Sequence, residues 1–176
     1  MNFSKKLVKE QIKPYLSQYR YIHTVMVAKI AEELAHINGV NPIKAFLAAM
    51  YHDVCKEFQD DKMRHWIDKE YFKETTNLKL LHGIASANFV RHKFACTDKQ
   101  VLNAIADHVM PPQHAPKLTM ILYLADKLES NKNGNYQNPN NYYLKKAEHN
   151  LKGVYQYIRD INAKDKTFWL TRKKHK

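Results

Sequence analysis

Six polar side chains stand at positions where a helical pattern calls for apolar residues. They are four histidines and two aspartates, namely His23, His52, Asp53, His82, His108 and Asp126. One such histidine is more often a hydrogen-bonded core residue than a metal ligand, but buried polar groups without partners are costly. A shared cation would satisfy all of them, and imidazole nitrogen with carboxylate oxygen suits iron, manganese, zinc or nickel rather than calcium. The pattern therefore favours a metal site over separate structural residues.

Three basic side chains lie beside this set or one helical turn from it. They are Arg20, Lys56 and Lys127. Residues three or four apart share a helix face, so Arg20 and Lys56 can face the same cavity and neutralise charge on a phosphate. The alternative for all three is solvation on exposed helix faces. Asp53 has two oxygens and could bridge two ions about 3.5–4 Å apart, a geometry that activates a water molecule.

Composition excludes several other kinds of site. The chain has 176 residues, 44% of them hydrophobic, and 29 basic against 17 acidic side chains give a net charge of +12. It is too apolar for a disordered chain, large enough for one core and basic enough to suggest an anionic partner. Its 4 glycines are scattered, which excludes a glycine-rich phosphate-binding loop. Its 2 cysteines form no CxxC pair, which excludes a zinc site made of thiolates. So few cysteines also fit a reduced cytoplasmic protein. No segment has the apolar length of a membrane span or the pattern of a signal peptide.

Apolar residues recur at helical spacing along most of the chain, and no stretch alternates as a strand would. This predicts a compact all-α domain over residues 1–176, with the metal-ligand core at 20–130 and C-terminal helices and a basic tail at 131–176. The first helix is expected to bury Tyr19 together with His23, and residues 130–135 are expected to form a polar loop. Helices are expected from after Pro14 to Asn38, with Gly39 as a left-handed stop; from an Asn41 N-cap through Tyr51 and beyond; from Asp60 through Ile67; over Leu78–Phe89; from a capping box at Thr97 and Gln100; over Leu118–Ala125; and from Asn138 through Ile158.

The order of the metal-binding candidates resembles a known signature. His23, then His52-Asp53, then Asp126, each on its own helix, is similar to the metal signature of the HD-domain superfamily, and His82 and His108 fall where its binuclear members carry two extra histidines. Longer pieces resemble one subgroup, the YqeK-type hydrolases, which cleave diadenosine tetraphosphate symmetrically to two ADP. These pieces are Arg20–His23, Ala48–Lys56, His82-Gly83, Ala104–His108 and Tyr123–Glu129. The chain departs from the subgroup at Val109–Pro112 and at Ser130–Lys132, where the subgroup's threonine, glycine, proline and arginine are replaced.

The resemblance implies an enzyme with the HD-type helical bundle of about 7–9 helices. It implies a hydrolase that cleaves dinucleoside polyphosphates with a metal-activated water, using one or two transition-metal ions, iron before manganese, zinc, nickel or cobalt. The implied ligands of the first ion are His23, His52, Asp53 and Asp126, and those of a second ion are His82 and His108 with Asp53 as the bridge. Asp53 and Lys56 are the implied catalytic residues. The implied substrate contacts are Arg20, Lys56, His82, His108 and Lys127.

Two alternatives remain at this stage. One keeps the metals and changes the substrate, giving an HD-type nucleotidase or phosphodiesterase that acts on mono- or cyclic nucleotides. The other is a non-catalytic basic helical module that binds nucleotide or RNA. Nucleic acid is disfavoured as a partner because the Lys and Arg residues are scattered rather than aligned on one helix face. We expect a nucleotide substrate and no membrane partner, and a homodimer is left open.

Overall fold

The computed structural model describes residues 4–73, 75–129 and 140–163, and over these ranges the chain is helical with no strand. The described α-helices are α1 (Lys5–Ile12), α2 (Gln18–Ile37), α3 (Pro42–Tyr51), α4 (Asp60–Arg64), α5 (Leu78–Lys93), α6 (Lys99–Asp107), α7 (Lys117–Leu128), α8 (Asn140–His149) and α9 (Leu151–Ala163). Two short 3-10 helices, Lys13–Tyr15 and Lys69–Lys73, lie between them. The predicted all-α bundle of seven to nine helices is confirmed in this part of the chain.

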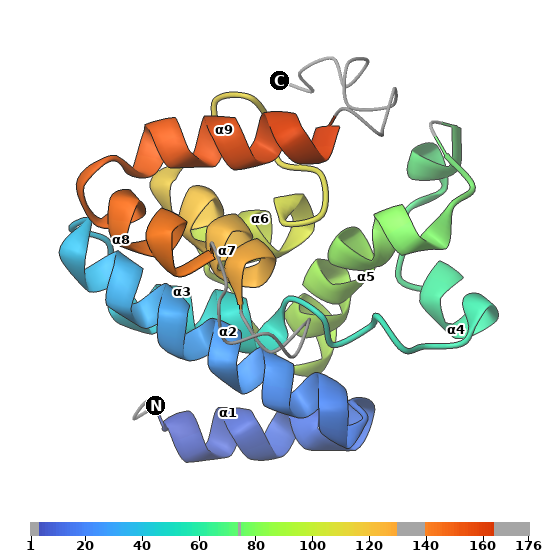
Figure 1. Cartoon of the computed structure of the whole chain (residues 1–176). Coiled ribbons are helices and arrows are strands. Elements are labelled where there is room, and N and C mark those ends of the chain that lie inside the picture. Colours follow the sequence, from blue (N-terminus) through green and yellow to red (C-terminus); the bar gives the residue numbers. More distant parts are fainter. Residues whose placement is uncertain (1–3, 74, 130–139, 164–176) are drawn as a thin grey trace.

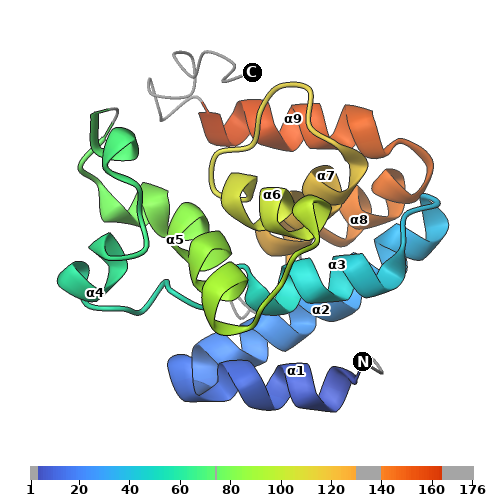
Figure 2. The ribbon, with the colours of Figure 1, turned by 180° about the vertical axis from the view of Figure 1, so that it is seen from behind.

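Helix α7 lies inside the bundle, between α2 and α3 on one side and α9 on the other (Figures 1 and 2). Of its 12 residues, all but Lys117 and Lys127 are buried. A helix that is apolar nearly all round is typical of a protein core. Because Asp126 lies near the C-terminal end of this helix, its carboxylate is placed in the core and is only 1% exposed.

Helices α2 and α3 pack against each other through small side chains. Ala28 and Ala31 of α2 and Ala45, Ala48 and Ala49 of α3 are all buried. Small residues at a helix contact allow the two axes to approach closely. This packing brings the first half of α2, which carries His23, against the residues that follow α3.

The predicted boundary between α2 and α3 is confirmed. Gly39 has a φ of 67°, the left-handed conformation that ends α2 at low steric cost. Asn41 caps α3, since its Oδ1 accepts the backbone N–H of Ile43 at 2.9 Å, and Pro42 occupies the first helical position.

Several predicted boundaries are wrong. Helix α3 ends at Tyr51 and not beyond it, because residues 52–58 form successive turns in which Lys56 N donates to Asp53 O at 2.9 Å. The N-cap of α6 is Asp98 and not Thr97, since the Asp98 carboxylate accepts the N–H of Gln100 at 2.9 Å. A carboxylate is also favourable near the positive end of the helix dipole, which favours Asp98 over the neighbouring hydroxyl.

The last predicted helix is two helices in the structure. Asn150 interrupts it and caps α9, because its Oδ1 accepts the N–H of Gly153 at 3.0 Å. Asparagine competes for backbone hydrogen bonds and therefore favours a cap over a helix interior. Helix α4 begins at Asp60 as predicted but ends at Arg64, before Ile67.

The N-terminal helix α1 was not predicted. Ser4 caps it, and Val8 and Ile12 are its only buried side chains, which is too few for a clear periodic signal. The expectation that Tyr19 is buried is also wrong, since Tyr19 is 58% exposed. It lies in the first turn of α2, whose buried residues begin at His23.

No helix in the described ranges combines the length and the apolar character needed to cross a membrane. The predicted polar loop at 130–135 and the basic tail at 171–176 lie outside the described residues.

Candidate metal centre

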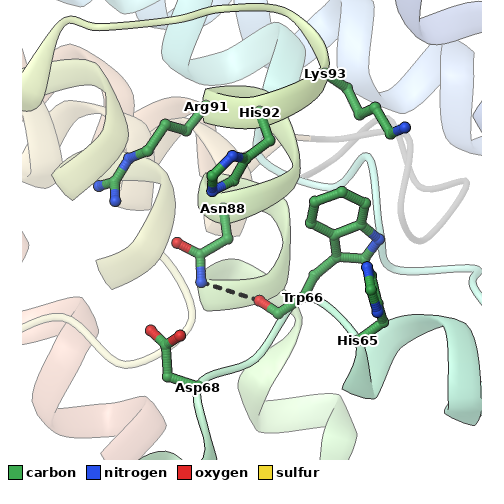
Figure 3. Close-up of a pocket in the computed structure, with 7 residues that line it drawn as sticks. All are labelled: His65, Trp66, Asp68, Asn88, Arg91, His92 and Lys93. Carbon is green, nitrogen blue, oxygen red and sulfur yellow. Dashed lines mark hydrogen bonds between the residues drawn. The ribbon is translucent and has the colours of Figure 1, made fainter.

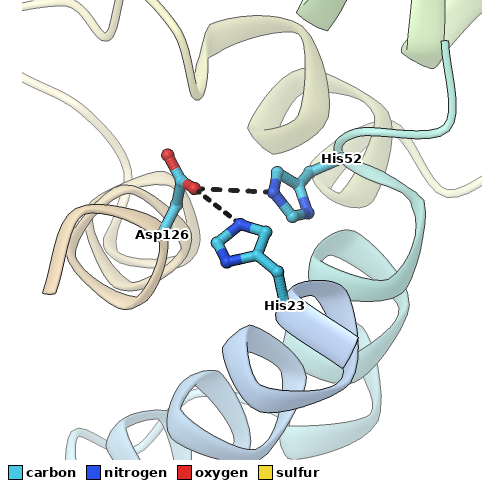
Figure 4. Close-up of side chains that lie close together, drawn as sticks. All are labelled: His23, His52 and Asp126. Atoms are coloured by element: carbon cyan, nitrogen blue, oxygen red, sulfur yellow. Dashed lines mark hydrogen bonds and ion pairs between the residues drawn. The ribbon is translucent and has the colours of Figure 1, made fainter. Parts of the chain in front are cut away.

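Three side chains from three different helical segments converge in the core. Figure 4 shows His23 from α2, His52 at the end of α3 and Asp126 from α7 pointing toward one another. The Asp126 Oδ1 atom lies 3.2 Å from His23 Nε2 and 3.7 Å from His52 Nε2. All three residues are buried, and their ligand atoms lie within 4.8 Å of one another. This is the spacing of groups that can hold one metal ion.

A second group of side chains shares Asp53. The Oδ1 atom of Asp53 lies 3.0 Å from His82 Nε2 and 3.4 Å from His108 Nε2, and the two imidazole nitrogens are 3.1 Å apart. The other oxygen of Asp53, Oδ2, lies 3.4 Å from His52 Nε2. Asp53 therefore directs one oxygen to each group, the arrangement that the bridging role predicted from the sequence requires.

Three of the four imidazoles, those of His52, His82 and His108, are held from their outer side in the same way. Nδ1 of His52 lies 2.6 Å from the carbonyl oxygen of Ala49, and His82 and His108 make equivalent contacts three residues back, at 2.8 and 2.7 Å. Each Nδ1–H is thus placed to donate to a backbone carbonyl. Such contacts fix the ring orientation and direct Nε2, the nitrogen that could bind an ion, into the site. All four Nε2 atoms face the two aspartates.

Glu129 is a site residue that the sequence analysis missed. Its Oε2 accepts a hydrogen bond from Nδ1 of His23 at 2.9 Å, and the side chain is only 1% exposed. A buried carboxylate on the far nitrogen of a histidine orients the ring and increases the basicity of Nε2. The sequence signal that could have found it is spacing, because Glu129 follows Asp126 by three residues and caps the C-terminal end of the buried helix α7.

The three predicted cations all lie at the site. Arg20 donates from Nη1 to Asp53 Oδ2 at 3.1 Å, and Lys56 donates to the same oxygen at 3.0 Å. Lys127 donates to Asp126 Oδ2 at 2.7 Å. The Arg20 side chain is 17% exposed, and those of Lys56 and Lys127 are about 30% exposed, so the two lysines mark where solvent reaches the site.

The charges of the site are coupled. Burial lowers the pKa of His52, but the Asp53 and Asp126 carboxylates outweigh burial and raise that pKa to about 9. Burial lowers the pKa of His108 to about 3 despite its contact with Asp53. Burial raises the pKa of Asp53, but His52, His108 and His82 outweigh it and hold the pKa well below its ordinary value. We conclude that, without a cation, the raised pKa of His52 keeps this imidazole protonated beside the Asp53 carboxylate.

The residues present fit a transition-metal ion. His52 Nε2 is buried and has no hydrogen-bond partner among the described residues, although it faces two carboxylates. An orphaned buried nitrogen of this kind is uncommon unless it serves an ion or a water molecule. The surrounding nitrogen and carboxylate donors suit iron, manganese, zinc, nickel or cobalt.

Close packing of α5 on α6 supports the second group. A Cβ atom on Gly83 would lie 2.9 Å from the carbonyl oxygens of Ile105 and Ala106 and 3.1 Å from His108 Nδ1. Only glycine allows α5 to approach the end of α6 this closely without a shift. Gly83 therefore permits His82 and His108 to meet.

The segment that departs from the resembled subgroup at Val109–Pro112 is packed against α9. Val109, Met110 and Pro111 are buried, Tyr155 donates from its hydroxyl to the Pro112 carbonyl at 2.5 Å, and Arg159 donates to the Pro111 carbonyl at 3.1 Å. The second departure, Ser130–Lys132, lies outside the described residues.

Comparison with known proteins defines the class. The HD domain family matches residues 20–131, more than half of the chain, so the protein belongs to the HD domain family. This range contains all six candidate ligands. A crystal structure from Clostridium acetobutylicum, of a "predicted HD superfamily hydrolase involved in NAD metabolism", covers 98% of this chain and 100% of its own with a TM-score of 0.76. At 24% identity, this likeness supports the fold.

Curated relatives are more similar in sequence. A symmetrical bis(5'-nucleosyl)-tetraphosphatase of Halalkalibacterium halodurans is 34% identical over 135 residues, which cover 75% of this chain and 71% of the relative. A probable nicotinate-nucleotide adenylyltransferase/Ap4A hydrolase of Mycoplasma genitalium is 36% identical over 124 residues, which cover 69% of this chain. The match spans only 35% of the Mycoplasma protein.

Proposed function

We propose that this HD-domain protein is a metal-dependent hydrolase of dinucleoside polyphosphates that cleaves diadenosine tetraphosphate to two ADP. The observation that carries the proposal is the convergence of four imidazole Nε2 atoms and two carboxylates at one buried point. The curated relative that bears the name symmetrical bis(5'-nucleosyl)-tetraphosphatase supports the choice of substrate.

The proposed ligands fall into two groups that share Asp53. His23, His52 and Asp126 would hold one ion, His82 and His108 a second, and Asp53 would direct one oxygen to each. The proposed ion is iron, with manganese, zinc, nickel and cobalt as alternatives of the same ligand chemistry. When bound, such an ion supplies a water molecule of lowered pKa and positive charge for the phosphate oxygens.

Three cations of the chain would hold the polyphosphate. Arg20 and Lys56 contact the same oxygen of Asp53, and Lys127 contacts Asp126. A metal ion bound to these carboxylates would compete with the three basic side chains for the carboxylate oxygens. The basic side chains would then be available to contact phosphate. Arg20 offers a planar fork that can hold two phosphate oxygens, whereas Lys56 and Lys127 act as point charges.

The test is metal analysis and product analysis of the wild-type protein beside Asp53→Ala. We expect the wild type to hold metal and to release two ADP from diadenosine tetraphosphate, and the variant to lose both properties. Asp160→Ala is the matched control, because Asp160 is an exposed carboxylate whose side chain is 68% accessible. Circular dichroism confirms that each variant is folded.

Three results would contradict the proposal. Equal metal content in the wild type and Asp53→Ala would refute the site. AMP and ATP as products would refute the symmetrical cut. Turnover of mono- or cyclic nucleotides alone would establish the nucleotidase or phosphodiesterase alternative.

A further inference from the structure

Glu57, a carboxylate outside the set of candidate ligands, joins the start of α2 to the turns that follow α3. Its Oε2 accepts the backbone N–H of Ser17 at 2.7 Å, and its Oε1 accepts the Ser17 hydroxyl at 2.9 Å. Ser17 is the N-cap of α2, and its hydroxyl oxygen in turn accepts the N–H of Arg20 at 3.2 Å. Glu57 therefore fixes the backbone from which the Arg20 side chain extends to the metal centre.

The same carboxylate also lies beside the guanidinium group of Arg20. Glu57 Oε1 is 4.0 Å from Arg20 Nε, while Nη1 of the same group donates to Asp53 Oδ2 at 3.1 Å. Nε is buried and has no hydrogen-bond partner among the described residues. The guanidinium thus makes ion pairs with two carboxylates, a fully buried Asp53 and a Glu57 whose side chain is 34% exposed.

Glu57 can keep Arg20 in place when the oxygens of Asp53 are taken by an ion. A buried guanidinium N–H without an acceptor is costly. Shortening the contact between Glu57 Oε1 and Arg20 Nε by about 1 Å would give a charge-assisted hydrogen bond of the usual length. The partial exposure of the Glu57 side chain leaves room for such a shift. Loss of the contact with Asp53 therefore does not release the arginine.

Arg91 lacks support of this kind. It lines a pocket of about 450 Å³ beside the C-terminal end of α5, and it makes no ion pair among the described residues. Figure 3 shows that Arg91 and Lys93 extend to opposite sides of α5, so this pocket does not bring two cations to one phosphate. The Arg20 side chain is 17% exposed, whereas Arg91 is exposed, and Arg91 therefore serves as a control for Arg20.

We propose that Glu57 is a positioning residue that holds the Arg20 guanidinium toward a phosphate group of the bound nucleotide. The inference rests on the proposed function for the class of substrate. Glu57 does not touch the nucleotide and acts through Arg20. An arginine that is oriented before the nucleotide arrives loses less conformational entropy on binding, so Glu57 strengthens binding rather than the chemical step.

Binding of ADP to the purified protein, measured by calorimetry, tests this role without turnover. Arg20→Ala should weaken ADP binding about tenfold, and Glu57→Gln about fivefold, which corresponds to about 1 kcal/mol. In the Arg20→Ala background, Glu57→Gln should have no further effect, because Glu57 acts only through the guanidinium. Arg91→Ala and Glu10→Gln are the controls and should bind ADP like the wild type. Glu10 is a matched carboxylate, since it also lies 4.0 Å from a cation, Lys6 Nζ.

Kinetics with diadenosine tetraphosphate give a second readout. Glu57→Gln should raise KM about fivefold and leave kcat unchanged, the pattern of an interaction that is equally strong in the ground state and the transition state. A structural role at Ser17 alone would instead lower the Tm of Glu57→Gln and leave the ADP affinity of the folded protein unchanged.

Four results would overturn the inference. Tighter ADP binding by Glu57→Gln would mean that Glu57 competes with phosphate for Arg20. Unchanged ADP binding by Glu57→Gln would remove the positioning role. An equal loss of affinity with and without the Arg20 side chain would show that Glu57 acts through the fold of α2. Unchanged ADP binding by Arg20→Ala would refute the contact with phosphate.

Failure of the proposed function is a separate outcome. A wild-type protein that binds ADP but does not hydrolyse diadenosine tetraphosphate would contradict the proposed function alone, because the ADP measurements would still decide the role of Glu57.

Discussion

Gly83→Ala tests whether close packing of α5 on α6 positions the second group of ligands. The added Cβ would lie 2.9 Å from two backbone carbonyl oxygens, whereas ordinary contacts begin at 3.4 Å, so the two helices must separate by about 0.5 Å. The carbonyl of Ile105 accepts the Nδ1–H of His108 at 2.7 Å, and the shift would therefore move that imidazole. Loss of such orienting contacts typically weakens metal binding about 10–100-fold.

The stability change is expected to be small. Steric crowding lowers the free energy of unfolding by about 1–3 kcal/mol. Alanine in place of glycine inside a helix raises it by about 1 kcal/mol. The net loss is about 0–2 kcal/mol, a fall in Tm of up to about 8 °C for a protein of this size. Metal affinity is therefore the more sensitive measurement, and competition with a chelator followed by metal analysis provides it.

Gly39→Ala is the matched control. Nothing lies within 4 Å of a Cβ at Gly39, and its φ of 67° makes alanine cost about 1–2 kcal/mol through backbone strain alone. The site is 16 residues beyond His23, about 24 Å along α2. We expect a similar loss of Tm with unchanged metal affinity. If Gly83→Ala binds metal as tightly as Gly39→Ala, the argument from helix packing is refuted.

Three further predictions concern the same site and its support. Glu129→Gln should weaken metal binding about 10–100-fold with little change in fold, because the amide still accepts from His23 Nδ1 but carries no charge; unchanged affinity would show that the buried charge is irrelevant. Metal affinity should rise between pH 7 and about pH 9, because the pKa of His52 is raised to about 9 and a metal ion must displace the proton on this imidazole. In the metal-free protein, the same raised pKa stabilises the folded state below pH 6.5. That stabilisation is lost as the pH rises through about 9. Competition with a chelator between pH 7 and pH 9 tests the first of these expectations. A metal affinity that does not change with pH would contradict it. Tyr155→Phe should lower the Tm by about 2–4 °C, measured by calorimetry, because the buried hydroxyl that donates to the Pro112 carbonyl is worth about 1 kcal/mol; an unchanged Tm would mean that water replaces this contact.

The helices that carry the candidate ligands were predictable from periodicity and capping. Asn41-Pro42 and Gly39 mark the boundary between α2 and α3 with local chemistry that needs no tertiary context. The boundaries that failed were decided by competition between neighbours. Asp98 displaces Thr97 as a cap, and Asn150 divides one expected helix into two.

Side chains on the solvent side were harder to place. The pattern assigned Tyr19 to the same stripe as His23, yet Tyr19 is exposed because it precedes the buried part of α2. Helix α1 buries only Val8 and Ile12 and gave no clear pattern. An apolar stripe predicts which face of a helix is buried. How much of that face is buried depends on how far the neighbouring helices extend along it.

The sequence by itself determined the kinds of candidate ligand and their helical register. His23 and Asp126 interrupt apolar stripes and His52-Asp53 follow the most apolar helix, so the sequence indicates which side of each helix carries them.

Tertiary packing alone decided how these groups meet. It placed Glu129 behind His23, and it directed one oxygen of Asp53 to His52 and the other to His82 and His108. The reason is geometric, because periodicity fixes directions within one helix, whereas distances between helices depend on the volumes of the side chains packed between them.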